Sequence, residues 1–417
     1  MACVTLQVGQ CGNQTGESFF SSLDSALQDP LKREVFFDKG NTARAVLVDM
    51  EPKVVQRCLN RRGDSWRYDE SASFWRQSGS GNNWAFGYGV YGPSSWEPVL
   101  ERIRHQTEKC DRLDSLLLIK STAGGTGSGV GAYLAQEIST HYGKTPLISV
   151  EMWPFKTGEV CVQSYNTILS ISAASEFSDL LCAFENSEMA RIAKDRLNIP
   201  KPSFNDINKI VASNLSHQFL SGALGAIANH LTVIPSLKIA TCRFAPQTSA
   251  AKFSADNWSA VASSLSRMHA TKTVIDFDQI NSRNNVALAS NLCFRGKGAG
   301  SIGKNSECLE NDSNRADPLS FFKKNEFFWN ESIEPMRVVL DGKTSNFHGL
   351  DRTVSSLSID QTPIVSLEHA TSKANEMLKH NAFVHLYENF GIEKDDLIDA
   401  LGTVTEISQR LKLLRKF

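Results

Sequence analysis

The stretch STAGGTGSG at residues 121–129 carries more information about the architecture than any other part of this chain. It follows an apolar run at 115–119 and precedes an amphipathic pattern at about 130–141. Glycines let the backbone approach a ligand closely, successive N–H groups form a nest for an anion, and the next helix adds its positive N-terminus. We therefore predict a phosphate-binding loop between a strand and a helix. It lacks the lysine of a P-loop and the spacing of a Rossmann turn, and its position argues against a flexible glycine linker.

Short apolar runs alternate with amphipathic stretches on both sides of this phosphate loop. The pattern predicts strands at 4–8, 43–48, 116–120 and 147–150, with helical segments between them. Such alternation is typical of a mostly parallel, doubly wound α/β sheet, whose ligands lie at the carboxyl ends of its strands.

The second half of the chain continues with a long helix, a second α/β region and a helical hairpin. An apolar pattern at 203–220 predicts a buried helix that joins two domains. Strand and helix alternation then returns, and the segment 296–332 is rich in Gly, Asn, Ser and charge, which is typical of a loop or insertion. Two helical patterns, 366–390 and 393–416, flank Gly391 and predict a hairpin.

Composition excludes several classes of function. The 417 residues carry 44 Lys+Arg against 45 Asp+Glu, and this balance removes the bulk electrostatic argument for a nucleic-acid or membrane-surface partner. No apolar run approaches the ~18 residues that span a bilayer, and no basic segment precedes the first predicted strand, so we expect no signal peptide. The nine cysteines include no C-x-x-C pair, which argues against a disulfide framework or a structural zinc site and for a reducing compartment.

Three further polar segments come at predicted strand ends, where a sheet of this kind binds its ligand. GQCGNQ at 9–14 offers backbone donors at a helix start together with amide side chains, and GSGNNWA at 79–85 repeats this chemistry. Asp49 and Glu51 follow the second predicted strand, where carboxylates could hold Mg²⁺ directly or through its waters. For Asp49, capping the helix that starts near Pro52 is an equally open alternative.

Three of these segments together resemble the nucleotide loops of the tubulin family. They are GQCGNQ at 9–14, GSGNNWA at 79–85 and GGTGSG at 124–129, and they occur in the family's order. The resemblance covers nearly the whole chain, and it implies a tubulin-like fold that binds GTP and Mg²⁺.

By this resemblance the chain divides into four parts. We expect a GTP-binding domain at 1–202 and a central connecting helix at 203–221. An intermediate α/β domain at 222–362 and a C-terminal helical hairpin at 363–417 would follow.

The resemblance also implies which residues contact the phosphates and the metal. Gln10 and Cys11 would lie by the phosphates and the base of GTP, and Glu51 would be the carboxylate on the Mg²⁺ side, with Asp49 beside it. The remaining phosphate contacts would be Asn82, Ser121, Gly124, Gly125, Thr126 and Gly127.

Four more residues would hold the nucleoside. The resemblance places Glu159 in the ribose loop and sets Asn186 and Asn208 against the guanine edge, where an amide can pair with both a donor and an acceptor. Phe204, one turn before Asn208, would stack on the base. The alternative for Phe204 is core packing, which its place in an apolar helical pattern favours.

The chain departs from the family in the segment after the central helix. Tubulins and their bacterial relatives carry there an acidic residue that positions water at the nucleotide of the neighbouring subunit. Here the segment is GALGAIANHL at 222–231, which contains no Asp or Glu, and Ala226 falls where the acid would align. Because water positioning and charge stabilisation supply much of phosphoryl-transfer catalysis, we expect a chain that binds GTP but is poor at triggering hydrolysis on a neighbour. Asn229 and His230 are weak substitutes for the acid. The chain's own GTP could still be cleaved when a partner with an acidic loop docks on it.

The C-terminus departs as well, because RLKLLRKF at 410–417 replaces the acidic tail of alpha and beta tubulins. We interpret these residues as the last turns of a helix, where cations interact favourably with the helix dipole. A contact to an acidic partner, such as the tail of another tubulin, is the alternative.

Three other stretches resemble the delta class of the family more than its alpha and beta classes. They are ARAVLVDMEPKV at 43–54, WP at 153–154 with TGEV at 157–160, and FGIE at 390–393. The resemblance implies a structural subunit that contacts other tubulins and centriole or basal-body components, and that supports triplet microtubules beneath cilia and flagella. Its expected location is therefore the cytoplasm and cytoskeleton. Two alternatives remain: a filament-forming GTPase subunit of another tubulin class, and a nucleotide-free centriolar scaffold.

Overall fold

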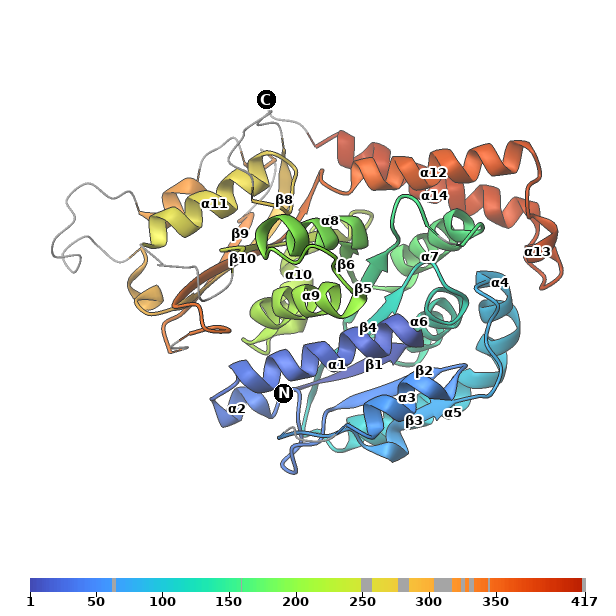
Figure 1. Ribbon diagram of the computed structural model, residues 1–417, viewed down its shortest axis with the longest axis horizontal. Coiled ribbons are helices and arrows are strands. Elements are labelled where there is room, and N and C mark those ends of the chain that lie inside the picture. Colours follow the sequence, from blue (N-terminus) through green and yellow to red (C-terminus); the bar gives the residue numbers. More distant parts are fainter. Residues whose placement is uncertain are drawn as a thin grey trace.

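The computed structural model describes residues 1–61, 65–158, 160–248, 257–276, 285–303, 317–323, 327–329, 334–343 and 346–414. Within these residues ten strands form one continuous sheet in the order β3-β2-β1-β4-β5-β6-β7-β10-β8-β9 (Figure 1). The strands are β1 Ala2–Val8, β2 Ala45–Asp49, β3 Ser73–Trp75, β4 Leu113–Ser121, β5 Leu147–Trp153, β6 Leu180–Glu185, β7 Ile239–Ala245, β8 Ala287–Gly296, β9 Met336–Asp341 and β10 Arg352–Asp360.

Helices cover this sheet. The α-helices are α1 Gly9–Ala26, α2 Pro30–Arg33, α3 Pro52–Leu59, α4 Trp84–Phe86, α5 Gly92–Glu108, α6 Gly131–His141, α7 Gln163–Phe177, α8 Asn186–Arg191, α9 Phe204–Phe219, α10 Leu224–Leu231, α11 Trp258–Ala270, α12 Ile364–Lys379, α13 His385–Glu388 and α14 Lys394–Lys412. Wider π-helical turns occur at Gly87–Tyr91, Thr126–Val130 and Ile192–Arg196, and 3₁₀ turns at Glu70–Ala72, Ala299–Ser301 and Pro318–Phe321.

The strand directions confirm the predicted mostly parallel α/β sheet. Neighbouring strands run parallel from β3 through β7, and only β10 runs antiparallel to its neighbours β7 and β8. The four strands predicted in the first half correspond to β1, β2, β4 and β5. A parallel strand must be followed by a crossover before its neighbour, so the carboxyl ends of these strands lie at one edge of the sheet with the turns that follow them.

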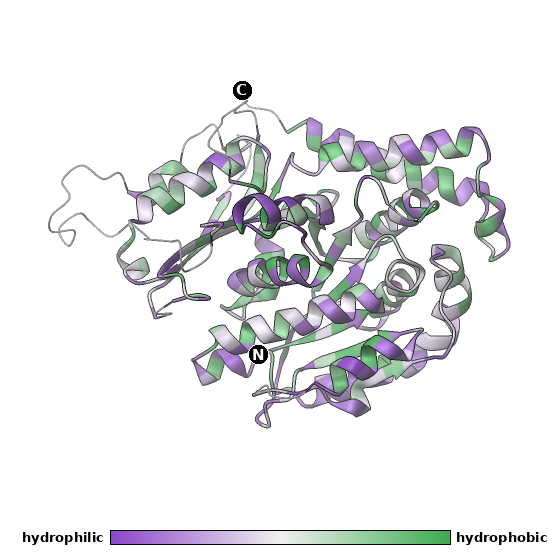
Figure 2. Cartoon of the chain, viewed as in Figure 1, coloured by the Kyte–Doolittle hydropathy of each residue, from purple (hydrophilic) through white to green (hydrophobic). Residues whose placement is uncertain are grey.

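Both faces of the central strands are buried, which explains their continuous apolar runs. Along β1, Val4 and Leu6 pack in a cluster with Val99 of α5 and Leu134 of α6, whereas Cys3 faces the opposite layer. Figure 2 shows the hydrophobic residues concentrated on the strands and on the helix faces turned toward them. No helix in the described residues is long and apolar enough to cross a membrane.

The central helix α9 confirms the predicted helix at 203–220. It begins at a capping box in which the Ser203 hydroxyl accepts from the backbone N–H of Asp206, and the Asp206 carboxylate accepts from the N–H of Ser203. Side chains join it to α1: the Ser22 and Ser216 hydroxyls lie 2.5 Å apart. The sheet nevertheless passes without a break from β6 to β7, on either side of this helix, so the predicted domain boundaries remain predictions.

The C-terminal hairpin pairs α12 with α14, and both pack on α7 (Figure 1). A short helix, α13, lies in the connection, and Gly391 adopts a φ of +80° just before α14. This left-handed conformation favours glycine. Helix α14 ends at Lys412, and residues 415–417 of the basic C-terminus lie outside the described residues.

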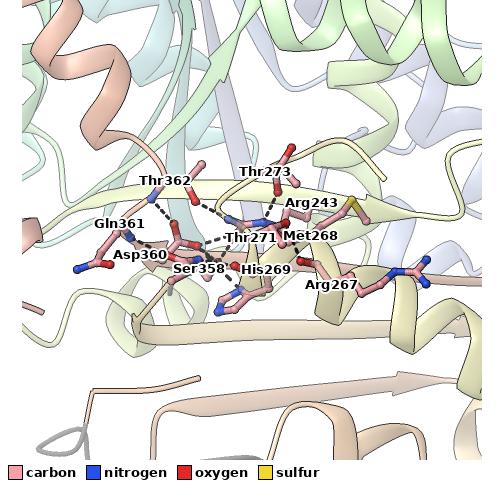
Figure 3. Close-up of polar contacts among 11 residues, drawn as sticks. Arg243, Arg267, Met268, His269, Thr271, Thr273, Ser358, Asp360, Gln361 and Thr362 are labelled. Carbon is pink, nitrogen blue, oxygen red and sulfur yellow. Dashed lines mark hydrogen bonds and ion pairs between the residues drawn. The ribbon is translucent and has the colours of Figure 1, made fainter. Parts of the chain in front are cut away.

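A buried ion pair fastens the second half of the sheet. The guanidinium of Arg243 on β7 lies 2.7 Å from the carboxylate of Asp360 on β10, and both side chains are fully buried (Figure 3). Arg243 also donates to the carbonyl of Thr273 at 2.8 Å and to the hydroxyl of Thr362 at 2.5 Å. Burial alone would raise the pKa of Asp360, but the charges of Arg243 and His269 outweigh it and lower the pKa to about 2.

The segment after α9 is helix α10 over Leu224–Leu231, because its apolar side chains Leu224, Ile227, Ala228 and Leu231 recur at helical spacing and form a buried face. The segment 296–332 includes the 3₁₀ turns at Ala299–Ser301 and Pro318–Phe321, while 304–316, 324–326 and 330–332 lie outside the described residues.

Candidate nucleotide-binding site

The structure brings the predicted phosphate loop together with two of the other polar segments at the carboxyl edge of the sheet. Gly9 has a φ of +77°, and a Cβ on it would lie 2.9 Å from the backbone nitrogen of Gly127. A Cβ on Gly125 would lie 2.5 Å from the Ser80 hydroxyl, which itself lies 2.9 Å from the hydroxyl of Thr126. Glycine at these positions therefore allows the start of α1, the segment at 79–85 and the phosphate loop to touch.

The end of β2 joins the same group through a carboxylate. A Cβ on Gly79 would lie 2.5 Å from Oε1 of Glu51, so the exposed Glu51 side chain lies against this glycine. Asp49 is buried, and its carboxylate accepts a 2.8 Å hydrogen bond from the N–H of Met50. Burial raises the pKa of Asp49 to about 6. Glu51 is itself the N-cap position of α3 but makes no side-chain capping bond, so its carboxylate remains available to a ligand.

An open cradle lies around Gly124. A Cβ there would lie 3.8 Å from Oδ1 of Asn82 and 4.0 Å from Oγ of Ser121, with no closer atom. Within the described residues, neither of these side chains nor that of Gln10 makes a hydrogen bond to the protein. Asn82 also adopts a φ of +53°, a left-handed conformation that Asn tolerates better than most residues. Unpaired polar side chains around an open glycine fit the oxygens of a phosphate.

Cys11 lies at the first turn of α1, as predicted, and is half-buried. Its sulfur is 4.0 Å from the hydroxyl of Thr15. Burial raises the pKa of the Cys11 thiol to about 11. The side chain therefore stays a protonated thiol near neutral pH, which suits packing against a ligand and not nucleophilic attack.

A cavity of about 970 Å³ runs along α1 and α9, from Gln10 and Phe204 at their first turns to Ser25 and Asn214. Gln10, Gln14, Phe204 and Asn208 all line it, so the structure brings the predicted base-contacting residues of α9 to the same space as the start of α1. The Asn208 Oδ1 accepts a 3.1 Å hydrogen bond from Thr15, which fixes the amide toward this cavity.

Phe204 does not pack in the core. Its side chain is 61% exposed, its ring lies 6.1 Å from that of Phe155, and it lines the cavity. The core-packing alternative is therefore wrong. The helical pattern misled because Phe204 occupies the first position of α9, before the helix enters the sheet layer.

Of the predicted nucleotide-site residues that the structure describes, Gln10, Phe204 and Asn208 line this cavity, whereas Cys11, Asn82, Asn186 and the phosphate-loop residues 121 and 124–127 do not. Asn186 begins α8, is half-buried and does not line the cavity at α9. Glu159, assigned to the ribose loop, lies outside the described residues.

Sequence reasoning missed the residues that hold the site together. Asn13 donates to the carbonyl of Gly9 at 2.9 Å and to that of Val48 at 3.0 Å, so it ties the start of α1 to the end of β2. Asn166 of α7 binds both the segment at 79–85 and the phosphate loop. Asn13 stands inside the GQCGNQ segment and could have been flagged, whereas Asn166 lies within a helix and carries no local signal.

The described residues hold no cluster of three or more His, Cys, Asp and Glu side chains able to bind a metal. Mg²⁺ needs no such cluster, because it commonly takes one or two carboxylates together with phosphate oxygens and waters. The unpaired carboxylate of Glu51 fits that requirement better than the buried Asp49 does.

The outward face of α10 lies elsewhere on the fold. Ala226 and Asn229 are exposed on it, and His230 is half-buried. They lie three and four residues apart, so they share one side of the helix, and the helix contains no acidic side chain.

A mostly parallel sheet, a central helix and a second α/β region are consistent with a fold of the tubulin type. The model of the Tubulin/FtsZ family GTPase domain matches residues 2–194. Over 98% of its length the chain is similar to tubulin delta chains: it is 32% identical to that of Mus musculus, 31% to that of Macaca fascicularis and 30% to that of Homo sapiens, and 98% of each relative is covered. The chain belongs to the tubulin family.

Proposed function

We propose that this chain is a GTP- and Mg²⁺-binding structural subunit of the delta-tubulin type, which contacts other tubulins at centrioles and basal bodies. There it supports the triplet microtubules beneath cilia and flagella. Full-length similarity to tubulin delta chains supports this role.

The single observation that carries the nucleotide assignment is the cradle at Gly124, with the unpaired side chains of Asn82 and Ser121 beside it. Asn82 is exposed and Ser121 is half-buried, so a phosphate can reach both side chains from solvent. No hydrogen bond that these side chains make within the described residues has to be broken when it binds.

Each part of the site has a distinct task in this proposal. Asn82, Ser121, Gln10 and the N–H groups at 124–127 bind the phosphates. Phe204 stacks on the guanine. Amides of Asn186 and Asn208 pair with the guanine edge, and Glu159 binds the ribose.

The metal completes the phosphate end. Glu51 would hold Mg²⁺, with Asp49 behind it. The ion would supply positive charge beside the phosphates.

GTP hydrolysis should differ between the two sides of the subunit, because one side would act on a neighbour's GTP and the other side carries the chain's own GTP. The exposed face of α10 presents Ala226 and Asn229 to the next subunit in place of an acid. The chain should therefore be poor at triggering hydrolysis of a neighbour's GTP, whereas its own GTP could still be cleaved when a partner with an acidic residue docks on it.

The test is to denature the purified chain and separate the released nucleotide by anion-exchange chromatography. Intact GTP is the expected result. GDP would mean that turnover occurs despite Ala226, and an empty pocket would favour the scaffold.

A matched pair of variants sharpens this test. Gly124→Val fills the cradle, while Gly402→Val adds the same side chain on α14, where a Cβ meets no atom within 4 Å. Only the first is expected to release the nucleotide. Microscopy of the tagged chain in ciliated cells tests the location separately, and exclusion from centrioles would contradict it.

A further inference from the structure

Asn166 lies at the meeting point of the phosphate loop, the segment at 79–85 and the C-terminal hairpin. Its side chain is fully buried, and its amide nitrogen donates to the carbonyl of Asn82 at 2.8 Å and to that of Ala123 at 2.7 Å. Its amide oxygen accepts from the N–H of Trp84 at 2.9 Å and from the hydroxyl of Tyr387 at 2.7 Å. All four hydrogen bonds that an Asn side chain commonly makes are therefore in use.

These four partners belong to three separate parts of the chain. Asn82 and Ala123 flank the Gly124 cradle, and Trp84 is the first residue of α4. Tyr387 belongs to α13, in what we name the connecting segment, residues 381–392 between α12 and α14. A single side chain thus links the backbone of both phosphate-contacting segments to the C-terminal hairpin.

The connecting segment has further contacts to the same region. The Asn83 amide donates to the carbonyl of Leu386 at 2.8 Å, while Asn83 also caps α4 by accepting from the N–H of Ala85 at 2.8 Å. The rings of Phe86 and Phe390 stack with centroids 4.7 Å apart. The packing is close, so a shift of the connecting segment must move the segment at 79–85 with it.

The hydroxyl of Tyr387 is protonated near neutral pH, and it donates to the side-chain oxygen of Asn166. Burial raises its pKa well above the usual value, and the carbonyl of Val162, 3.3 Å away, is its other acceptor. Tyr165 contacts the same segment differently: its hydroxyl donates to the carbonyl of Ala382 at 3.1 Å and reaches neither phosphate-contacting segment.

We propose that Asn166 is a positioning residue of the nucleotide site and that, through Tyr387, it couples nucleotide binding to the conformation of the connecting segment. This inference rests on the proposed GTP binding. A phosphate bound at the cradle restrains Asn82 and Ala123, which restrains Asn166 and so favours the docked position of Tyr387. Because such coupling is reciprocal, undocking Tyr387 from Asn166 must weaken nucleotide binding by the same factor.

The test compares two variants of the full chain that each remove one buried tyrosine hydroxyl. Tyr387→Phe breaks the bond to Asn166, whereas Tyr165→Phe, the matched control, breaks a bond to the connecting segment alone. Equilibrium binding of labelled GTP gives the affinity, and hydrogen–deuterium exchange of peptides from 381–392, with and without GTP, gives the coupling.

We expect GTP to slow exchange in the connecting segment of the unmodified chain. Tyr387→Phe should weaken GTP binding about fivefold to tenfold, the effect of one hydrogen bond, and should reduce the slowing by GTP. Tyr165→Phe should speed exchange with and without GTP and leave the affinity within about twofold.

A second variant keeps the test decisive when Tyr387→Phe fails to fold. Asn83→Ser retains a capping oxygen for α4 but cannot reach the carbonyl of Leu386, and it should weaken GTP binding in the same direction. Equal GTP affinity in Tyr387→Phe and the unmodified chain, or equal weakening by both tyrosine variants, would overturn the inference alone. An unmodified chain that binds no GTP would overturn the proposed function and the inference together.

Discussion

The amino group of Lys120 lies 2.6 Å from the carboxylate of Glu151, and both side chains are fully buried within the sheet. Lys120 immediately precedes Ser121 of the phosphate loop and also donates to the hydroxyl of Ser170 at 2.6 Å. The second carboxylate oxygen of Glu151 has no partner in the described residues. The ion pair therefore holds the strand from which the phosphate loop departs, and it depends on both charges being present.

Replacement of one partner of this pair should be costly. Lys120→Met leaves Glu151 as an uncompensated buried charge, and we expect a loss of about 3–5 kcal/mol in the free energy of unfolding. The double variant Lys120→Met with Glu151→Leu should recover most of that loss. Urea unfolding of the unmodified chain, Lys120→Met and the double variant measures the three free energies of unfolding. A Lys120→Met chain as stable as the unmodified chain would contradict the prediction.

The Arg243–Asp360 pair predicts a pH dependence of stability. Because the pKa of Asp360 is lowered to about 2 in the folded chain, against ~3.9 for an unperturbed Asp, ionised Asp360 stabilises the fold fully above about pH 4. This stabilisation is lost as the pH falls toward 2. The stability difference between the unmodified chain and Asp360→Asn should therefore be constant from pH 7 to about 5 and shrink below 4. Urea unfolding across this range measures it, and a difference independent of pH would count against the ion pair.

Phe204→Ala should weaken GTP binding without unfolding the chain. Stacking of an aromatic ring on a base contributes about 1–3 kcal/mol, which corresponds to roughly 5- to 150-fold in affinity. The exposed ring supports little of the core, so the melting temperature should hardly change. Val233→Ala, a comparable truncation of an exposed side chain outside the cavity, is the control. Unchanged GTP affinity in Phe204→Ala would show that the Phe204 ring does not stack on the base.

Glu51→Gln should reduce the contribution of Mg²⁺ to GTP binding by roughly tenfold, about 1.4 kcal/mol, because the neutral amide is a weaker ligand for a hard cation. GTP affinity is measured with Mg²⁺ and with a chelator. Asp49→Asn should have the smaller effect, since Asp49 is buried and bonded to the N–H of Met50. The reverse order would reassign the metal carboxylate to Asp49.

Ala226→Glu should restore the ability to trigger hydrolysis. The position is exposed on α10, so the substitution should change the free energy of unfolding by no more than about 0.5 kcal/mol. Release of phosphate from GTP at high chain concentration should rise by at least about tenfold. Ala226→Gln, of equal size but uncharged, should leave the rate unchanged, and a rate increase in both variants would point to assembly and not to the acid.

The sequence was most informative where short-range patterns set the structure. Apolar runs located β1, β2, β4 and β5 but not β3 or β6. Glycines after β1 and β4 located the candidate phosphate cradle, because the close approach of the backbone there requires glycine. Phe204 was misjudged from its helical pattern, since exposure depends on what packs over a position and not on the pattern alone. Helix α10 was not predicted, because the segment 222–231 was considered only for its missing acidic residue.

The links between distant segments could not be foreseen. Asn166 and Tyr387 are 221 residues apart and meet through one hydrogen bond, and neither stands in a motif. The continuity of the sheet from β6 to β7 was equally hidden, because strand pairing across a long connection leaves no periodicity in either strand.

That continuity would have a mechanical consequence if the chain assembled into a filament. Residues Leu181–Ala183 of β6 pair directly with Ile239–Thr241 of β7, so force applied to one half of the chain reaches the other through backbone hydrogen bonds and not only through side chains. Bending the two halves against each other would have to displace β6 relative to β7 and break the hydrogen bonds between them. The subunit should therefore resist bending as a single stiff plate, and flexibility in an assembly built from it would reside at the junctions between subunits.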